Sequence, residues 1–203
     1  MMKGLFRKDL YMLWFYCKSF LLLIVIFALA SLGSSNNAFF TVYPVMLGSV
    51  LPVTLISYDE RSHWNSCCQT LPVSRSLVVV EKYLFALFCN LCMLTLTALV
   101  QFISFARESV FLLDRYLNMM STMFVLAFFS PSIILPLIFK YGSEKGRIAY
   151  YFAICTACAL AFMFNDRQFP VIPLPNILLP LLALGAMGFS CWVSIQFYRK
   201  REL

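Results

Sequence analysis

Long apolar stretches make up most of this chain, and short polar segments divide them. No charged residue occurs from Ser19 to Tyr58, and the later apolar stretches are similarly long. A helix needs about 20 apolar residues to cross roughly 30 Å of hydrocarbon. The pattern therefore predicts a single domain of six membrane-spanning helices, at about residues 17–34, 38–57, 77–103, 116–139, 148–165 and 177–198.

The polar segments between these spans predict turns and loops. Gly, Ser and Asn residues in SLGSSNN (31–37) indicate a turn between the first two spans. Charged connections follow at 104–115 and 140–147. Residues 165–176 contain three prolines, which argue against a continuous helix and leave an outer connector whose structure the pattern does not define.

The N-terminal segment KGLFRKDLYMLWF (3–15) has a different pattern. Leu10 and Trp14 belong to an apolar series at helical spacing, and Arg7 and Lys8 lie between its members. This pattern predicts a short amphipathic helix in the membrane interface, with its basic residues toward the lipid headgroups. An ordinary cytoplasmic lead-in to the first span is the alternative.

Composition also indicates a membrane protein. Hydrophobic residues make up 62% of the 203 residues, charged residues only 12%, and the mean hydropathy is +0.83. A soluble domain of this length carries about a quarter charged residues, so lipid must solvate most of the surface. A cleaved signal peptide ending near Ala28 to Ala30 is disfavoured, because the basic lead is long and aromatic and further apolar spans follow.

The net charge of +7 is distributed unevenly. With a cytoplasmic N-terminus, 13 of the 16 Lys and Arg residues fall in inner segments, and only Arg107, Arg115 and Arg167 fall in outer ones. Short cytoplasmic loops carry an excess of Lys and Arg. We therefore expect a plasma-membrane protein with both termini cytoplasmic, and we interpret the positive charge as a topology signal, not as a nucleic-acid-binding surface.

The longest polar interruption, YDERSHWNSCCQTLPVSRSLVVVEKY (58–83), lies between the second and third spans. A helix beginning at Asp59 would gather apolar side chains on one face, namely Trp64, Cys67, Cys68 and Leu71. Such a helix could lie along the membrane surface. Pro72 would end it, and Ser74 is placed to cap the next span. The alternative is a solvated loop with an interfacial tryptophan.

Candidate chemistry within the spans is sparse. Glu81 and Lys82 are the deepest charges, and both lie near enough to the inner boundary to snorkel toward water. The span centres lack the ionisable residues that proton- or sodium-coupled transporters place there. No phosphate-binding G-x-x-x-x-G-K-[ST] motif occurs, since the nearest glycines, Gly142 and Gly146, are followed by Arg147. ATP hydrolysis would therefore have to come from another chain.

The eight cysteines predict neither a metal site nor a disulfide framework. Most lie inside apolar stretches, where cysteine behaves as a small hydrophobe. Cys89/Cys92 and Cys155/Cys158 could bring four sulfurs together, but their separation does not fit a zinc ribbon and no nearby basic residue would stabilise thiolates. We interpret His63, the only histidine, as a solvated or interface residue.

These features resemble the permeases of type-2 ATP-binding-cassette (ABC) exporters, in particular the small bacterial members. One span ends in the acidic pair Asp59-Glu60, a short amphipathic segment with Trp64 follows, and L-P-V-S-R (71–75) leads into a span with Lys82. The KYGSEKGR loop and the basic N-terminus also resemble that class. The layout covers the whole chain, whereas the local motif covers only the 58–83 region.

The resemblance implies an all-α integral membrane protein with six transmembrane helices, an amphipathic N-terminal helix and a short cytoplasmic coupling helix at residues 59–71. In the family, that helix seats in a groove of a soluble ATPase. The implied coupling residues are Asp59, Glu60, Arg61, Trp64, Cys68 and Leu71, with Glu60 and Trp64 as the main contacts. The implied helix boundary consists of Pro72, Ser74 and Arg75. No catalytic residue is implied for this chain, since ATP and Mg²⁺ would bind the partner.

The resemblance also implies two permease copies, as a homodimer or a heterodimer, each docking one ATPase, with a substrate path between the copies. Many Phe and Met residues suit an apolar or amphipathic cargo, and the habit of the class favours a peptide. Two other functions stay open. A vitamin-binding subunit of an importer would have a polar pocket on the outer side, and a membrane-embedded enzyme would need convergent polar residues within the spans.

Overall fold

The computed structural model describes residues 2–33, 38–64, 68, 74–107, 113–152 and 178–200. The helices that begin and end within these residues are α1 (Met2–Tyr16), α2 (Lys18–Gly33), α3 (Ala38–Arg61), α5 (Arg75–Arg107), α6 (Leu113–Tyr141) and α8 (Leu178–Lys200). Residues 143–152 are also helical, and none of the described segments contains a strand. The expected all-α architecture is confirmed for this part of the chain.

Four helices, α3, α5, α6 and α8, each contain a segment long and apolar enough to cross a membrane. A fifth crossing is added if α1 and α2, which meet at a bend of 73°, form one broken span. The predicted limits of five spans agree with α2, α3, α5, α6 and α8 to within a few residues. The remaining predicted span, 148–165, lies mostly outside the described residues, so the count of six stays a prediction.

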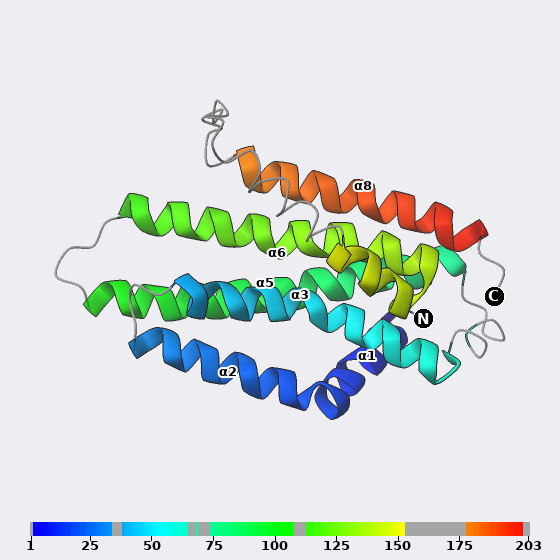
Figure 1. Ribbon diagram of the computed structural model, residues 1–203, viewed down its shortest axis with the longest axis horizontal. Helices are drawn as coiled ribbons and strands as arrows, with labels where there is room; N and C mark the ends of the chain where they lie inside the picture. The colour runs from blue at the N-terminus through cyan, green and yellow to red at the C-terminus, as the bar shows by residue number, and fades with distance from the viewer. Residues whose placement is uncertain are drawn as a thin grey trace.

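The helices form a bundle whose members run along one long axis. Figure 1 shows α2, α3, α5, α6 and α8 in this common direction, with α1 turned across the end where α8 finishes. The helix α3 packs against α2, α5 and α6, and α8 packs against α5 and α6. The end of α3, the start of α5 and the end of α8 therefore meet at the same end of the bundle as α1.

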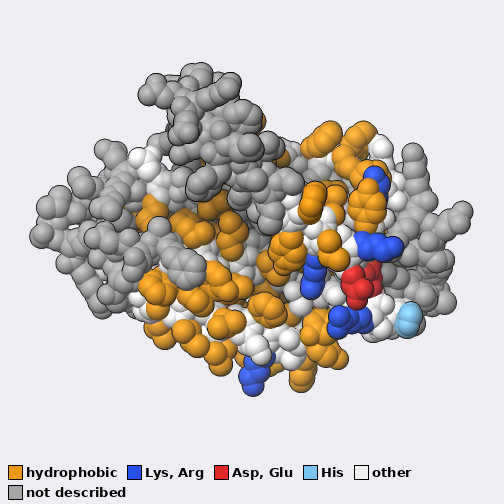
Figure 2. Space-filling view, in the orientation of Figure 1, with side chains coloured by type: hydrophobic (Ala, Val, Ile, Leu, Met, Phe, Trp, Pro, Cys, Tyr) orange, Lys and Arg blue, Asp and Glu red, His pale blue; other side chains and the backbone are white. Residues whose placement is uncertain are grey.

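Apolar side chains fill the interior and also cover much of the exterior. One core joins α3, α5, α6 and α8 around Phe128, Leu135 and Met187, and a second joins α1 and α2 to α3 and α5 around Phe85. Large apolar side chains on the outside stay exposed, as lipid-facing residues do. Figure 2 shows the acidic side chains and most of the basic ones gathered toward one end of the visible face.

Two prolines inside α6 are matched by side chains from neighbouring helices. Proline has no N–H, so the carbonyl four residues earlier loses its helical partner. Pro131 frees the carbonyl of Ala127, which accepts a 2.8 Å hydrogen bond from Asn90 Nδ2 on α5. Pro136 frees the carbonyl of Ser132, which accepts a 2.6 Å hydrogen bond from Ser190 Oγ on α8. Both freed carbonyls are thus satisfied within the bundle, as a lipid environment demands.

The helix α1 only partly matches the amphipathic interfacial helix expected from the sequence. Its 73° angle to α2 suits a helix that lies along a membrane surface while α2 crosses it. Trp14 and Phe15 are exposed, as is Arg7. However, Asp9 is fully buried and Lys8 is turned toward the bundle, so the expectation that every basic residue faces headgroups is wrong for Lys8.

Candidate functional site

The end of α3 was expected to start a separate surface helix at Asp59, and the structure places the break later. The helix α3 continues through Arg61, and His63 N–H then donates to the carbonyl of Glu60 at 3.2 Å. His63 has a φ of 54°, in the left-handed region that ends helices. Helical residues resume at Trp64. Asp59, Glu60 and Arg61 are therefore the last turn of the second predicted span.

The rest of the predicted coupling segment is described only in part. Cys68 is buried, with 7% of its surface exposed, and burial raises the pKa of its thiol above the ordinary value. Leu71 and Pro72 lie outside the described residues. Ser74 directly precedes α5, and its carbonyl accepts a 3.0 Å bond from Leu77 N–H, so Ser74 lies at the N-cap position of that helix.

An ion cluster ties the end of α3 to α1 and α5. Lys82 Nζ donates to Asp59 Oδ2 at 2.7 Å and to Asp9 Oδ2. Lys8 Nζ lies 2.7 Å from Asp59 Oδ1 and 3.2 Å from Asp9 Oδ1. Each of these two aspartates contacts both lysines, so three helices share one network. We call Lys8, Asp9, Asp59, Glu81 and Lys82 the charge cluster.

Four of the five side chains of the charge cluster are buried, and the Lys8 side chain is 22% exposed. This burial corrects the expectation that Glu81 and Lys82 snorkel to water. Glu81 is 2% exposed and Lys82 is 5% exposed. Glu81 Oε2 lies 4.0 Å from Lys82 Nζ, and within the described residues Glu81 Oε1 has no hydrogen-bond partner. The cluster holds three acidic and two basic side chains. Buried charges require partners, because the transfer of each ion out of water costs on the order of several kcal/mol.

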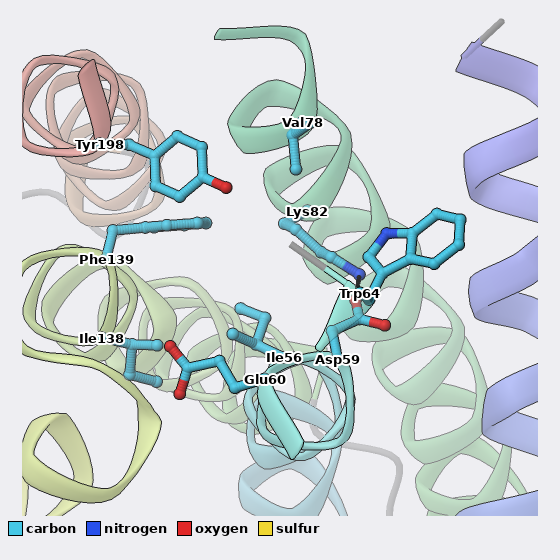
Figure 3. A pocket seen from close by; sticks show the side chains of 9 residues that line it. All are labelled: Ile56, Asp59, Glu60, Trp64, Val78, Lys82, Ile138, Phe139 and Tyr198. Carbon is cyan, nitrogen blue, oxygen red and sulfur yellow. Dashed lines mark hydrogen bonds and ion pairs between the residues drawn. The ribbon is translucent and has the colours of Figure 1, made fainter. Parts of the chain in front are cut away.

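Glu60, one residue further along α3, makes a contact in another direction. Its Oε2 accepts a 2.7 Å hydrogen bond from Ser143 N–H, the first residue of the 143–152 helix. The first N–H groups of a helix lack internal partners and favour a negative charge, so this carboxylate caps the helix. Figure 3 shows Glu60 directed toward Ile138 and away from Asp59 and Lys82.

The turn that Glu60 caps is tight. Gly142 has a φ of 88°, and its N–H donates to the carbonyl of Ile138 at 2.8 Å, which ends α6. A Cβ on Gly146 would lie 2.8 Å from Ile138 Cα, so only glycine lets the 143–152 helix approach α6 this closely. The ends of α6 and of the 143–152 helix are therefore held as one corner.

The remaining side chains at the end of α3 divide into exposed and contacting groups. Arg61 and His63 are exposed. Trp64 is half-buried, and Lys8 Nζ lies 4.4 Å from the centroid of its ring, a cation–π contact between α1 and the coupling segment. Of the predicted coupling residues, Asp59 and Cys68 are turned inward, Glu60 caps a helix, and Arg61 is available on the surface.

A small pocket opens between these groups, and Figure 3 shows the side chains around it. Its lining residues are Ile56, Asp59, Glu60, Trp64, Val78, Lys82, Ile138, Phe139 and Tyr198. Its volume is about 20 Å³ for the centre of a water-sized sphere, which is room for about one water molecule. The pocket is therefore part of a helix junction and is too small to hold a cargo.

A second buried polar group lies further along α5. Tyr83 Oη is 2.7 Å from both Ser190 Oγ and Ser194 Oγ of α8. Because Ser190 donates its proton to the carbonyl of Ser132, Tyr83 must donate to Ser190, and Ser194 to Tyr83. This directed chain of hydrogen bonds fastens α5, α8 and α6 to one another.

Sequence reasoning missed Lys8 and Asp9 as partners of the 58–83 region. The available signal was an acidic residue, Asp9, in a basic and aromatic segment that otherwise fits a membrane interface.

The predicted cysteine pairs are only partly described. Cys89 is buried and Cys92 is exposed on α5, while the second pair lies outside the described residues.

Comparison with known protein families covers almost the whole chain. The family described as ABC-2 family transporter protein matches residues 4–199. No protein with a curated description matches. The match spans α1 to the end of α8, and thus includes the charge cluster, the end of α3 and the 143–152 corner. The chain belongs to the ABC-2 transporter family and is a type-2 permease, the membrane subunit of an ABC transporter.

Proposed function

We propose that this permease works as the transmembrane half of an exporter, and that residues 59–71 dock a separate ATPase subunit. Hydrolysis of Mg²⁺-ATP on that subunit would then drive export of an apolar or amphipathic substrate, with a peptide as the leading candidate. Two permease copies, identical or related, would each bind one ATPase. Both termini and the docking segment, residues 59–71, would face the cytoplasm at the plasma membrane.

The observation that carries this proposal is the combination of an exposed tip and a fixed base at the end of α3. Arg61, the last residue of α3, and His63 after it are exposed, whereas Asp59 behind them is 4% exposed and joined to two lysines. A partner that presses on the tip would therefore move a helix that is long enough to span the membrane. Such a connection can bias a bundle between two arrangements.

The two other functions considered from the sequence gain less support. A vitamin-binding importer subunit needs a roomy polar pocket at the end of the bundle opposite the charge cluster. In the described residues, a pocket at that end that includes polar side chains, around Ser31 and Gln101, has no volume for a water-sized sphere, and the larger hollow along the first half of α8 is lined by apolar residues. A membrane-embedded enzyme needs an accessible group of reactive side chains, and the three carboxylates of the charge cluster are buried.

A pulldown tests the docking proposal. Tagged wild-type protein, purified from its native membrane in mild detergent, is expected to carry ATPase activity with it. The variant Arg61→Glu with Trp64→Ala should lose that activity, because the exposed charge is reversed and the half-buried ring removed. Lys18→Glu, a reversal of an exposed charge on α2, is the matched control and should retain it.

The outcomes separate the two parts of the proposal. If no ATPase accompanies the wild-type protein, the exporter function loses its support. If an ATPase accompanies the wild type and the Arg61/Trp64 variant equally, a partner exists but the docking segment has been placed wrongly. Selective loss in the Arg61/Trp64 variant would support both parts.

A further inference from the structure

We propose that the neighbouring carboxylates Asp59 and Glu60 form a fork that fastens the docking segment to two different helices, α1 and residues 143–152. Consecutive residues of a helix point about 100° apart and do not face the same neighbour. The two side chains accordingly diverge in Figure 3, with Asp59 beside Lys82 and Glu60 toward Ile138. This inference rests on the proposed docking role of residues 59–71, and it assigns positioning roles that docking alone would not require.

The Asp59 arm of the fork reaches α1. Asp59 uses one carboxylate oxygen for Lys82 and the other for Lys8, and both lysines also contact Asp9 of α1. Asp9 has no exposed surface. Sliding α1 relative to α3 would separate at least two ion pairs where little water can replace them, and breaking a buried pair is strongly destabilising. The cation–π contact between Lys8 and Trp64 adds a second link on the same side.

The Glu60 arm reaches the 143–152 corner. Its bond to Ser143 N–H lies at the first residue of that helix, and the corner behind it is rigid because Gly146 sits against the backbone of Ile138. A displacement of Glu60 would therefore carry the start of the 143–152 helix and the end of α6 together. The two arms meet in the α3 backbone between Asp59 and Glu60.

A fork of this kind makes one pushed segment act on two sides of the bundle. Movement of the docking segment would rotate α1 through Asp59 and pull the α6 corner through Glu60. Lys82 is the positioning residue of the first arm, since it bridges α1 and α3 from its place on α5. Without Asp59, the ion-pair link between α1 and α3 should be lost while the corner stays attached. Without Glu60, the start of the 143–152 helix should lose its cap while α1 stays attached, and the bond from Arg147 Nη2 to the carbonyl of Val53, at 3.3 Å, would remain as the other link of that helix to α3.

Hydrogen–deuterium exchange of the purified permease in lipid nanodiscs tests the fork without any ATPase. In Asp59→Asn, the amides of α1 should exchange at least about tenfold faster than in wild type, with residues 143–152 unchanged, since tenfold corresponds to loss of about 1.4 kcal/mol of local protection. Glu60→Gln should give the reverse pattern. Asp59→Asn leaves two acidic and two basic side chains in the charge cluster, so it is not expected to prevent folding.

Glu144→Gln is the matched control for Glu60→Gln, because Glu144 lies at the same helix start but is exposed. It should change exchange in residues 143–152 by at most about fivefold, less than the tenfold expected for Glu60→Gln, because the charge of an exposed residue contributes only about 0.3–1 kcal/mol there. Identical exchange patterns in the Asp59 and Glu60 variants, or no change in either, would overturn the fork. The pulldown tests whether residues 59–71 dock an ATPase, and hydrogen–deuterium exchange tests the fork without one. Either proposal can therefore fail while the other is supported.

Discussion

Lys82 lies on a helix that is long and apolar enough to span a membrane, yet its ammonium group is held by carboxylates from two other helices. A single residue thus fixes the relative positions of α1, α3 and α5. The energetic consequence is asymmetric. A complete charge cluster contributes little net stability, whereas a cluster that lacks one of its lysines leaves uncompensated buried carboxylates.

Replacement of Lys82 tests that asymmetry. In Lys82→Met, Asp9 and Asp59 keep only Lys8, and the free energy of unfolding should fall by about 3–5 kcal/mol. Thermal unfolding in detergent, followed by tryptophan fluorescence, should show a clearly lower midpoint. The double variant Lys82→Met with Asp9→Asn should recover part of the loss, since it removes one of the stranded charges. Lys140→Met, at an exposed site, is the control, and an equal midpoint in Lys82→Met and Lys140→Met would contradict the expected effect.

The glycine at the α6 corner provides a second test at the scale of one residue. A Cβ at Gly146 would lie 2.8 Å from the Cα of Ile138, and backbone cannot yield as a flexible side chain can. Gly146→Ala should therefore lower the unfolding midpoint, with a loss of about 1–3 kcal/mol. Gly185→Ala on α8 is the matched control, because nothing lies within 4 Å of its added carbon. A tolerated Gly146→Ala would mean that the corner is looser than the structure shows.

At the scale of the element, α6 illustrates how a membrane helix accommodates two prolines. Each freed carbonyl accepts a hydrogen bond from a specific side chain on a neighbouring helix, Asn90 for Ala127 and Ser190 for Ser132. The prolines thus convert bonds within α6 into bonds between helices. This exchange makes the position of α6 depend on α5 and α8.

A paired substitution tests this dependence. Asn90→Leu removes the donor to Ala127 and should destabilise the protein by about 1–3 kcal/mol, the cost of an unsatisfied buried carbonyl. Pro131→Ala restores a backbone N–H four residues after Ala127. The double variant should therefore be more stable than Asn90→Leu alone, as read from unfolding midpoints. If the stability changes of Asn90→Leu and Pro131→Ala simply add in the double variant, the Asn90 side chain does not compensate for the missing N–H of Pro131.

The success of sequence reasoning also differs between elements. The apolar pattern located α2, α3, α5, α6 and α8 because each is long and bounded by polar residues. The same pattern predicted that the second span ends at residue 57, because the charged residues Asp59 and Glu60 indicated the start of a surface segment. In the structure, α3 continues to Arg61. The charge cluster could not be predicted, because Lys82 and Asp9 are 73 residues apart in the chain and no periodicity reports such a pairing.

At the scale of the whole molecule, charges and helices together define two ends. The end of α3, the start of α5 and the end of α8 lie together with α1, where most of the described basic residues also occur. The opposite end carries the end of α5 and the start of α6. This arrangement agrees with the assignment of 13 Lys and Arg residues to inner segments and three to outer ones. The topology then depends on whether α2 crosses the membrane, because α2 meets the criteria for a span only together with α1.

Reporter fusions at successive positions decide whether α2 crosses the membrane. Alkaline phosphatase, which is active only outside the cytoplasm, should be active when fused after residues 35, 110 and 170. Green fluorescent protein, which fluoresces inside, should be bright after residues 64, 144 and 203. Inactive phosphatase and bright fluorescence at residue 35 would mean that α1 and α2 both stay on the inner side. The end of α3 would then lie outside, where no ATPase could reach Arg61, so this one position tests the topology and the docking proposal together.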